Sequence, residues 1–248
     1  MCPDTQRHRG AHPDDRRLFA ESQVPALRTA TDELSWLLTR GYPIHASLKL
    51  VGDRYGLGER QRVAVSRAAC SDTSRDRRRS SRLPLESLQG ASVVVDGFNL
   101  LITVEAALSG GLILVCRDGC LRDLASVHGS YRHVQETEEA LCLIGETLQT
   151  FAPATVEWLL DRPISNSGRL AQQIRDLAAQ HSWPWSVELV FNPDPVLIAS
   201  ESIVLTSDSA ILDGVKRWAD VNAYLIPRQV PQAWRIDLRS ESAVFAGP

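Results

Sequence analysis

The stretch SVVVDGFNL, at residues 92–100, decides the fold that this 248-residue chain is expected to adopt. Its first four residues form a short run dominated by valine, which is typical of a buried strand, and Asp96 stands where that strand would end. The stretch IVLTSDSAIL, at residues 203–212, repeats the arrangement, because an apolar run leads through Thr-Ser to Asp208. Both stretches predict a strand that brings a carboxylate to its carboxyl end.

Further apolar runs alternate with amphipathic segments along the same part of the chain. Residues 156–160 predict a strand that stops at Asp161, and residues 187–191 predict another, which Asp194 follows after three residues. Strands separated by helices indicate a parallel sheet covered on both faces, so the predicted fold class is α/β. Helices are expected at residues 134–151, 167–181 and 209–219, and a fifth strand at residues 223–226.

The predicted strand ends suggest the chemistry of a site. The loops that leave the carboxyl ends of parallel strands meet at one edge of a sheet, so four aspartates from four segments are expected to converge there. Such carboxylates repel one another and raise each other's pKa unless cations neutralise them. Mg²⁺ and Mn²⁺ prefer oxygen ligands and could activate a water against a phosphodiester bond. The four residues are Asp96, Asp161, Asp194 and Asp208.

A simpler interpretation of each aspartate is available. An aspartate after a strand is often a helix N-cap or a turn former, and Asp208 could cap a helix and bind metal as well. That interpretation accounts less well for four acids at equivalent places in the topology. The site hypothesis therefore rests on the set rather than on any one residue.

Two of these stretches carry a resemblance to a known superfamily. Residues 93–101 resemble the first strand and turn of the NYN branch of PIN-like nucleases, and residues 203–212 resemble the late strand, turn and helix of the same superfamily. In that superfamily, aspartates at these two places bind the catalytic metal, which implies this role for Asp96 and Asp208. Asp161 is similar to the acid after the second central strand, and Asp194 to a further acid before the Thr-Ser-Asp strand.

The resemblance covers about residues 90–226 and implies a three-layer PIN-like domain with a central parallel sheet. It further implies a metal-dependent endoribonuclease that uses Mg²⁺ or Mn²⁺, with Asp96, Asp161 and Asp208 as catalytic residues and Asp194 as an additional metal ligand. The whole chain also resembles a family of uncharacterised archaeal and bacterial proteins that join a small helical module to this domain. That second likeness implies an architecture but no substrate.

The expected organisation has four parts. Residues 1–17 are predicted to be a disordered tail, residues 18–70 a helical module, residues 71–90 an arginine-rich linker and residues 91–248 the PIN-like domain. The helical module has the outline of a helix-turn-helix, which three-helix bundles of other purpose share. Contact with DNA or RNA, a structural role and the formation of a homodimer all remain open for this module.

Charge is distributed unevenly along the chain. From Arg54 to Arg82 there are nine arginines and three acidic residues, whereas from Leu83 onward there are eleven basic and twenty acidic residues. A basic segment before an acidic body suggests a docking surface for a polyanion such as RNA beside a carboxylate-rich site. A solvated basic linker is the alternative.

The segment between Leu108 and Tyr131 departs from a minimal PIN pattern, because it is polar and contains glycines and mixed charges. Its arginines could grip substrate phosphates and His128 could assist proton transfer, unless the segment is simply a solvated hairpin. Cys116 and Cys120 lack the CxxC pairing and the fourth ligand of a zinc site. The candidate substrate-binding residues are Asn99, Arg117, Arg122, His128, Arg132, Asn166 and Ser207.

Composition and missing motifs exclude several classes of protein. No run of about 18 apolar residues predicts a membrane span, and an odd number of cysteines, five, at irregular spacing favours a reducing cytoplasm. The first strand is not followed by a G-x-G-x-x-G motif, and no P-loop or G-x-S-x-G motif is present. Phe98 occupies the place of the second aspartate of an aspartyl-phosphate phosphatase.

Two functions remain after these exclusions. The first is a metal-dependent endoribonuclease in which a metal-activated water attacks the phosphodiester bond. The second is a catalytically inactive PIN-like module that binds RNA or a protein. Four clustered carboxylates favour the enzyme, because a scaffold without activity has no need of them.

Overall fold

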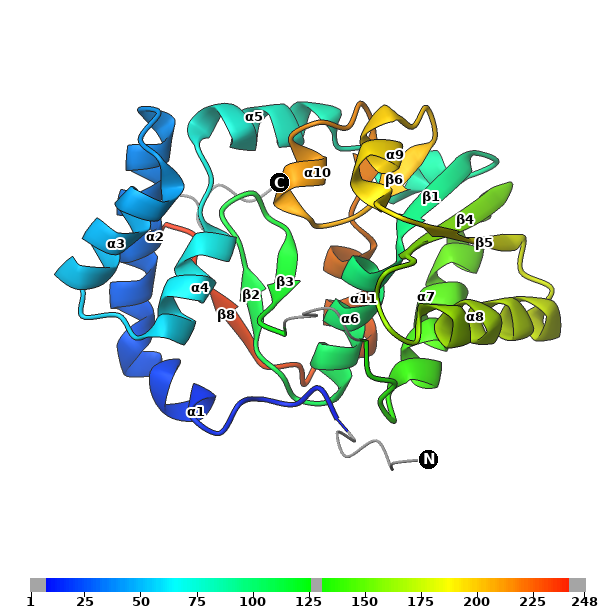
Figure 1. Cartoon of the computed structure of the whole chain (residues 1–248), viewed down its shortest axis with the longest axis horizontal. Coiled ribbons are helices and arrows are strands. Elements are labelled where there is room, and N and C mark those ends of the chain that lie inside the picture. Colours follow the sequence, from blue (N-terminus) through cyan, green and yellow to red (C-terminus); the bar gives the residue numbers. More distant parts are fainter. Residues whose placement is uncertain (1–7, 126–130, 241–248) are drawn as a thin grey trace.

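The computed structural model describes residues 8–125 and 131–240, whose arrangement is shown in Figure 1. A five-stranded parallel sheet, with the strand order β5-β4-β1-β6-β7, forms the centre of the larger part of the molecule. The prediction of an α/β fold with a central parallel sheet is therefore confirmed. The strands are β1 (Ser92–Asp96), β4 (Thr155–Asp161), β5 (Trp185–Val190), β6 (Ile203–Leu205) and β7 (Trp218–Ala219).

Helices cover both faces of this sheet. Successive residues of a strand point to opposite faces, so alternate residues of β1 belong to different hydrophobic cores. Val93 and Val95 of β1 belong to a core that includes residues of α6, α7, α8 and α11, whereas Val94 packs in a second core with residues of α9 and α10. The domain thus has three layers. These helices are α6 (Gly97–Leu108), α7 (Thr137–Phe151), α8 (Ser167–His181), α9 (Pro193–Ala199), α10 (Ser209–Leu212) and α11 (Val221–Gln229).

The N-terminal part of the chain is helical, as predicted, and a second, smaller sheet lies beside it. This sheet has the order β3-β2-β8, in which β2 and β3 form an antiparallel hairpin and β8 pairs parallel to β2. The small strands are β2 (Ile113–Val115), β3 (Leu121–Asp123) and β8 (Arg235–Asp237). The N-terminal elements are α1 (Asp15–Leu18), η1 (Glu21–Gln23), α2 (Val24–Thr39), α3 (Ile44–Arg54), α4 (Glu59–Ala68), α5 (Asp72–Ser81) and η2 (Leu85–Leu88).

The helical module and the small sheet share one hydrophobic core. Leu27 and Leu34 of α2 and Val65 of α4 pack in the same cluster as Leu114 of β2 and Ile236 of β8. The segment after Leu108, for which a solvated hairpin was one expectation, is a hairpin whose strands are largely buried. Helices and hairpin therefore stabilise each other, and the core crosses the boundary expected near residue 70.

The arginines of α4 are used inside the molecule. Arg60 forms an ion pair with Asp15 at 2.6 Å, and Arg62 forms one with Asp53 at 2.8 Å. Arg67 donates hydrogen bonds to the carbonyl groups of Asp123 and Ala125. Because these intramolecular contacts engage every arginine of α4, they favour a structural role for this helix.

The expected linker at residues 71–90 contains helix α5 instead. Ser71 caps this helix by accepting a hydrogen bond from the backbone N–H of Ser74 at 3.0 Å. Arg78 is buried because its guanidinium pairs with Asp118 at 2.6 Å and with Asp213 at 2.7 Å. An arginine-rich run resembles a solvated linker in the sequence, but carboxylates from distant segments neutralise its central charge and anchor the helix.

Part of the tail at residues 1–17, which was expected to be disordered, has a defined position in the structure. Residues 1–7 lie outside the described residues, and residues 8–17 pack against the body. Arg9 is buried in an ion pair with Glu105 of α6, and Asp15 is buried against Arg60. A polar stretch predicts disorder, but here its buried charged residues pair with residues that lie far away in the sequence.

Two expectations near the C-terminus are also wrong. Residues 223–226 lie in α11 rather than in a strand, because Asp220 accepts a hydrogen bond from the N–H of Ala223 at 2.9 Å and caps that helix. The helix expected at residues 209–219 ends at Leu212, and the fifth strand is β7. The spacing of the apolar residues Val215 and Trp218 is compatible with a helix or with a strand. Trp218 and Ala219 form a strand because they pair with β6.

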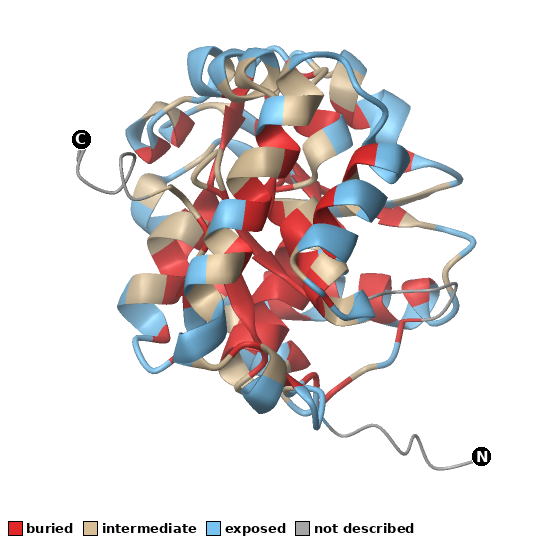
Figure 2. Ribbon diagram, turned by 90° about the vertical axis from the view of Figure 1, so that its left-hand side faces the viewer, coloured by how far each residue is buried: buried red, intermediate tan, exposed pale blue. Residues whose placement is uncertain are grey.

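Figure 2 shows buried residues on the inward sides of the helices and exposed residues on their outer sides, with the strands buried between them. Within the described ranges, no helix combines the length and the apolar character needed to cross a membrane.

Candidate functional site

The strand order determines where a ligand can bind. β1 lies at the centre of the sheet, with β4 and β5 on one side and β6 and β7 on the other, so the direction of winding reverses next to β1. In open α/β sheets, such a switch point leaves a crevice at the carboxyl ends of the strands. Asp96 ends β1, and because Val95 pairs with Leu205, Thr206 follows directly at the neighbouring end of β6. The crevice is therefore bordered by Asp96 and by the Thr206–Asp208 turn.

Asp96 is buried, with 7% of its surface exposed, and no basic side chain pairs with it in the described structure. Its Oδ2 accepts a hydrogen bond from the hydroxyl of Thr206 at 2.7 Å. Burial raises the pKa of Asp96 to about 7, and repulsion from Asp208, Asp194 and Asp161 adds to the rise. All four predicted carboxylates thus lie within electrostatic reach of one point.

Asp208 caps a helix, as its sequence position suggested. Its Oδ1 accepts hydrogen bonds from the N–H groups of Ala210 at 2.7 Å and Ile211 at 3.3 Å, and so caps α10. Its own N–H donates to the hydroxyl oxygen of Thr206 at 3.0 Å. Capping engages one carboxylate oxygen, which leaves Oδ2 compatible with binding a cation.

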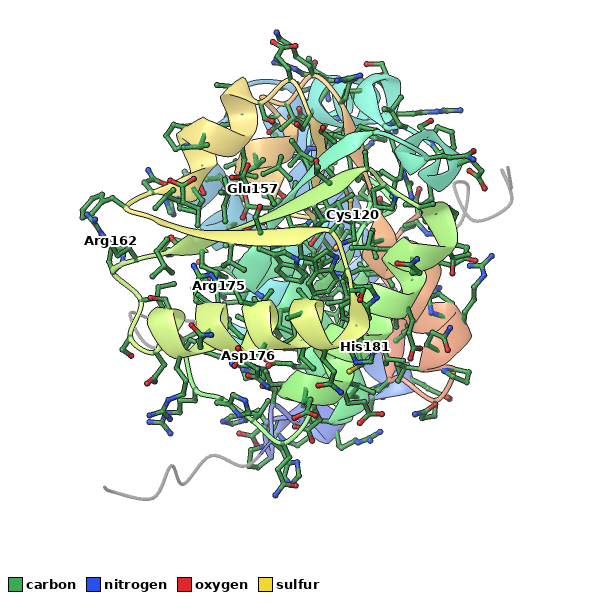
Figure 3. The ribbon with its side chains drawn as sticks, turned by 90° about the vertical axis from the view of Figure 1, so that its right-hand side faces the viewer. Cys120, Glu157, Arg162, Arg175, Asp176 and His181 are labelled. Carbon is green, nitrogen blue, oxygen red and sulfur yellow. The ribbon has the colours of Figure 1, made fainter. Side chains whose placement is uncertain are left out.

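Asp161 and Asp194 extend the acidic cluster toward the outer strands. Burial is the main cause that raises the pKa of each, and repulsion from Asp194 contributes at Asp161, as repulsion from Asp208 does at Asp194. Asp161 ends β4, and Asp194 lies in the first turn of α9, which Asn192 caps. Figure 3 looks onto the β5 edge, with Arg162, directly after Asp161, at one end and His181, the last residue of α8, at the other.

A cleft of 510 Å³ opens at this edge, and both parts of the molecule line it. Asp96, Asp194 and Asp208 line it from the large sheet, whereas Asp161 is not among the lining residues. Ile44, Ser66 and Arg67 line it from α3 and α4 of the helical module. The cleft is therefore enclosed only because the helical module is packed against the sheet domain.

Asn99 and Ser207, two of the predicted substrate contacts, line the cleft and hold each other. The side-chain oxygen of Asn99 accepts hydrogen bonds from the N–H of Ser207 at 2.9 Å and from its hydroxyl at 2.8 Å. This clamp ties the start of α6 to the turn after β6. These hydrogen bonds thereby fix the position of Asp208 relative to Asp96, which directly precedes α6.

Arg122 lines the cleft and Arg117 does not, and internal partners engage both guanidinium groups. Contact with substrate phosphates stays a prediction for both residues. Arg122 is buried, pairs with Asp118 at 2.6 Å, and donates from Nε to the carbonyl of Ser207 at 2.7 Å. Arg117 pairs with Asp72 at 2.6 Å and donates to the carbonyl of Cys70. Arg122 supports the turn that carries Asp208, and Arg117 holds the start of α5.

The remaining predicted substrate contacts are not brought into the cleft. Asn166 donates to the carbonyl of Tyr131 at 2.8 Å, and the carbonyl of Arg132 accepts a hydrogen bond from Arg9. Neither Asn166 nor Arg132 is among the residues that line the cleft. His128 lies outside the described residues, so its suggested role in proton transfer stays a prediction.

Some lining residues were not predicted as contacts. Asp123 is buried, accepts a hydrogen bond from Thr103 at 2.8 Å and lies 3.6 Å from Arg67. Its place in a polar, mixed-charge segment was the one sequence signal for it. Thr206 does not line the cleft, but it belongs to the Thr-Ser-Asp motif, so its hydroxyl could have been proposed as a partner of a neighbouring carboxylate. Arg67 carried no signal, because only the packing of α4 brings it to the cleft.

The side chains of the cleft differ in whether they could coordinate a metal ion. In the part of the chain that the structure describes, no group of three or more His, Cys, Asp or Glu side chains could hold an ion by itself. Mg²⁺ retains several waters and commonly uses one or two carboxylates together with substrate phosphates. Asp96 and Asp208 at one crevice fit such a hydrated ion. Cys116 and Cys120 are buried thiols whose pKa burial raises, which fits a structural role rather than zinc binding.

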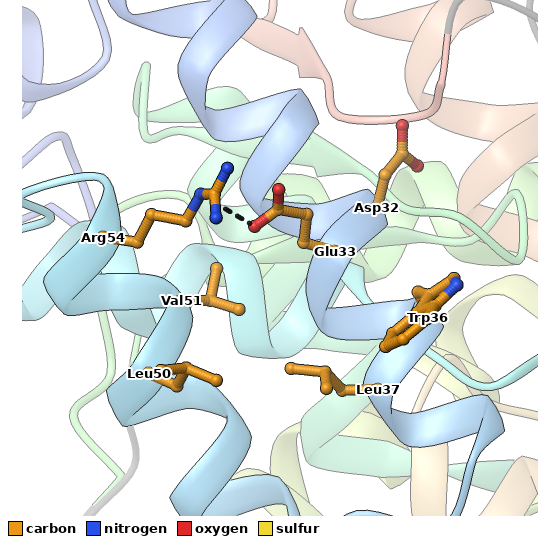
Figure 4. Close-up of a pocket in the computed structure, with 7 residues that line it drawn as sticks. All are labelled: Asp32, Glu33, Trp36, Leu37, Leu50, Val51 and Arg54. Atoms are coloured by element: carbon orange, nitrogen blue, oxygen red, sulfur yellow. Dashed lines mark ion pairs between the residues drawn. The ribbon is translucent and has the colours of Figure 1, made fainter.

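A larger hollow of 620 Å³ lies in the helical module, between α2 and α3, and has a different character. Figure 4 shows Trp36, Leu37 and Leu50 around it, with Glu33 and Arg54 joined in an ion pair. Its lining is mostly apolar, and its one ion pair is satisfied. Asp32 also lines this hollow, and burial raises its pKa. Volume alone would favour this hollow, but several carboxylates gather only in the smaller cleft, which is the candidate site.

The fold and the site define a three-layer α/β protein with a carboxylate-lined cleft that a packed helical module helps to enclose. Residues 85–224, more than half of the chain, match the family model described as Domain of unknown function (DUF5616), and the chain belongs to this family. Residues 26–81 match the family model described as Protein of unknown function (DUF434). The second match runs to the end of α5, so this helix belongs with the helical module rather than with a linker.

A relative matches most of this chain. The chain is 31% identical over 203 residues to an uncharacterised protein of Methanocaldococcus jannaschii, a match that covers 81% of this chain and 97% of the relative. Neither of the two matching family models is a PIN or NYN family. No solved structure matches the chain significantly.

Proposed function

We propose that this protein is a metal-dependent nuclease that hydrolyses phosphodiester bonds of RNA. The observation that carries the proposal is the cluster of four carboxylates at the switch point of a parallel sheet, three of which line an open cleft. Mutual repulsion at this cluster is relieved when a divalent cation binds, and a bound cation in turn attracts phosphate. The likeness of residues 93–101 and 203–212 to PIN-like nucleases of the NYN branch supports RNA as the substrate.

In this proposal, some residues would bind the metal ion and others would position its ligands. Asp96 and Asp208 would hold Mg²⁺ or Mn²⁺, with Asp194 and Asp161 adding negative charge on the outer side of the cleft. The ion would supply a water of lowered pKa and positive charge against the scissile phosphate. The hydroxyl of Thr206 orients Asp96, and its hydrogen bond favours the ionised carboxylate that a cation needs. Asn99 and Arg122 hold the Ser207 turn and thereby position Asp208.

The test is cleavage of single-stranded and structured RNA by the full chain with Mg²⁺ or Mn²⁺. Asp96→Asn and Asp208→Asn should lower the cleavage rate by at least about 100-fold, because each removes a ligand of the ion. Asp176→Asn is the matched control, since Asp176 is an exposed aspartate on α8 that bonds only to Gln172 among the described residues. Circular dichroism should show that all three variants keep the fold.

One observation favours a second function, an inactive module that binds RNA or a protein. Within residues 8–125 and 131–240, no three ligands are assembled for an ion. If the purified chain cuts neither RNA nor DNA with either metal, and Asp96→Asn binds metal as the wild type does, the inactive module becomes the better proposal.

A further inference from the structure

A basic hollow of 450 Å³ lies at the end of β7, separate from the acidic cleft. Arg79 and Arg82, at the end of α5 and just beyond it, and Arg228, near the end of α11, line it together with a single acidic residue, Asp220. The described structure thus gathers three guanidinium groups around one carboxylate. This excess of positive charge is unusual for this part of the chain, because most of the charged residues after Leu83 are acidic.

The three arginines are less engaged than the buried Arg78 and Arg122. Arg79 is exposed and has no partner among the described residues. Arg82 lies 3.6 Å from Asp220, beyond hydrogen-bond distance, and Arg228 stacks on the ring of Tyr224 at 3.9 Å and donates to its carbonyl. By contrast, Arg78 and Arg122 are buried and fully paired. The hollow therefore offers guanidinium donors that the fold does not use.

Asp220 forms the floor of the hollow and has spare bonding capacity. Its side chain is 1% exposed, Oδ1 caps α11, and Oδ2 has no hydrogen-bond partner in the described structure. A buried oxygen without a partner costs stability unless a ligand or a water satisfies it. A ligand with a hydroxyl group beside its negative charge would satisfy both Asp220 and the arginines.

We infer that this hollow binds a phosphate monoester, the terminal phosphate of a nucleic-acid strand. A phosphate monoester carries about −1.5 to −2 charges at neutral pH, which suits three arginines set against one carboxylate. Guanidinium groups donate two parallel hydrogen bonds to phosphate oxygens, so a compact arginine group prefers a terminal phosphate over a singly charged phosphodiester. Leu83, Pro84 and Tyr224 add apolar surface for the terminal sugar or base.

The hollow and the cleft lie on the same edge of the molecule. β6 and β7 are neighbours in the sheet, and the cleft follows β6 as the hollow follows β7. Arg78, next to Arg79 in α5, donates to the carbonyl of Ser209, which lines the cleft. A strand that is held by its terminal phosphate in the hollow could therefore enter the cleft. Only this last step rests on the proposed function.

The experiment compares the binding of three RNA octamers to the full chain in EDTA, where no divalent ion is available for cleavage. One octamer carries a 5′-phosphate, one a 3′-phosphate and one neither group. The wild type should bind one phosphorylated octamer about tenfold more tightly than the octamer without phosphate. Inorganic phosphate should compete with that octamer.

Variants then assign the preference to the hollow. Arg79→Gln and Arg228→Gln together should abolish the preference while leaving the fold intact, because both side chains are exposed. Arg235→Gln, an exposed arginine on β8 outside the hollow, should keep it. Equal binding of all three octamers by the wild type, or a preference that survives the double substitution, would overturn the inference.

The outcome is separable from that of the proposed function. A preference for a terminal phosphate without any cleavage in Mg²⁺ or Mn²⁺ would leave the hollow established and the nuclease proposal refuted. Cleavage without such a preference would do the reverse.

Discussion

Asp96 and Asp118 are both buried aspartates at the same end of the molecule, yet their surroundings are opposite. Asp118 accepts hydrogen bonds from Arg78 and Arg122, each at 2.6 Å, and these arginines hold the pKa of Asp118 below its usual range despite its burial. Asp96 has a hydroxyl as its partner and three further carboxylates around it, and its pKa rises to about 7. The contrast separates a carboxylate that stabilises the fold from one that is available for chemistry.

This difference explains how one edge can carry so many acids. The Arg78–Asp118–Arg122 group joins α5, the β2–β3 hairpin and the turn after β6, because Arg78 also binds Asp213 and Arg122 also binds the carbonyl of Ser207. Charges that are paired in this way rigidify the frame of the cleft. Inside this frame, Asp96 is repelled by the other three carboxylates.

The largest effect is expected from Asp118→Asn. Removing one charge from a buried ion-pair group leaves two arginines without compensation, which typically costs about 3–5 kcal/mol. Unfolding by urea should show this loss of stability, and Asp176→Asn should show almost none. A loss below about 1 kcal/mol would mean that the group is not the structural element that its geometry suggests.

Ionisation of Asp118 and ionisation of Asp96 are expected to change the stability of the fold in opposite directions. Because the pKa of Asp118 is lowered in the folded state, its contribution is present above its unfolded pKa of about 4 and is lost as the pH falls below that value. The pKa of Asp96 is raised, so ionisation of Asp96 destabilises the folded state progressively between about pH 4 and pH 7.

The second prediction follows for Asp96→Asn. This substitution removes a buried, repelled charge, so the variant should be more stable than the wild type by roughly 2–4 kcal/mol at about pH 8, and by little below about pH 4. Unfolding curves at several pH values measure the difference. Added Mn²⁺ should stabilise the wild type more than the variant, and equal stabilisation would contradict binding of the ion at Asp96.

The smallest effect is expected from Thr206→Val. The hydroxyl of Thr206 favours the ionised form of Asp96, so its removal should raise the pKa of Asp96 further and cost about 1 kcal/mol of stability at neutral pH. Ser202→Ala, at a half-buried residue directly before β6, is a suitable control. An unchanged pH profile would show that Thr206 does not control the charge of Asp96.

Much of the larger domain could be predicted from short stretches. Four of the five strands, and helices α7 and α8, were expected within a few residues of where they lie, because buried strands and amphipathic helices leave local patterns of apolar residues. Asp96 and Asp208 were identified for a similar reason, since Asp96 directly follows an apolar run and Asp208 follows one after Thr-Ser. The short β7 was missed because two residues, Trp218 and Ala219, leave no period to detect.

The basic residues were the less predictable part. Arg117 and Arg122 were expected to bind phosphates, but their partners, Asp72 and Asp118, hold them inside the molecule. A sequence shows that a guanidinium is present but not whether a carboxylate will reach it. Exposed and buried arginines therefore look alike until the chain is folded.

The sequence by itself determined the alternation of strands and helices, the aspartates that end β1 and β4, and the aspartate in the turn after β6, since all of these depend on neighbours within a few residues. Only the tertiary structure decided which charges are neutralised and which remain open. Arg78 meets Asp118 and Asp213 across separations of 40 and 135 positions, and no local pattern records such a pairing. Burial makes these pairings strong, and the carboxylates that they leave unpaired form the candidate site.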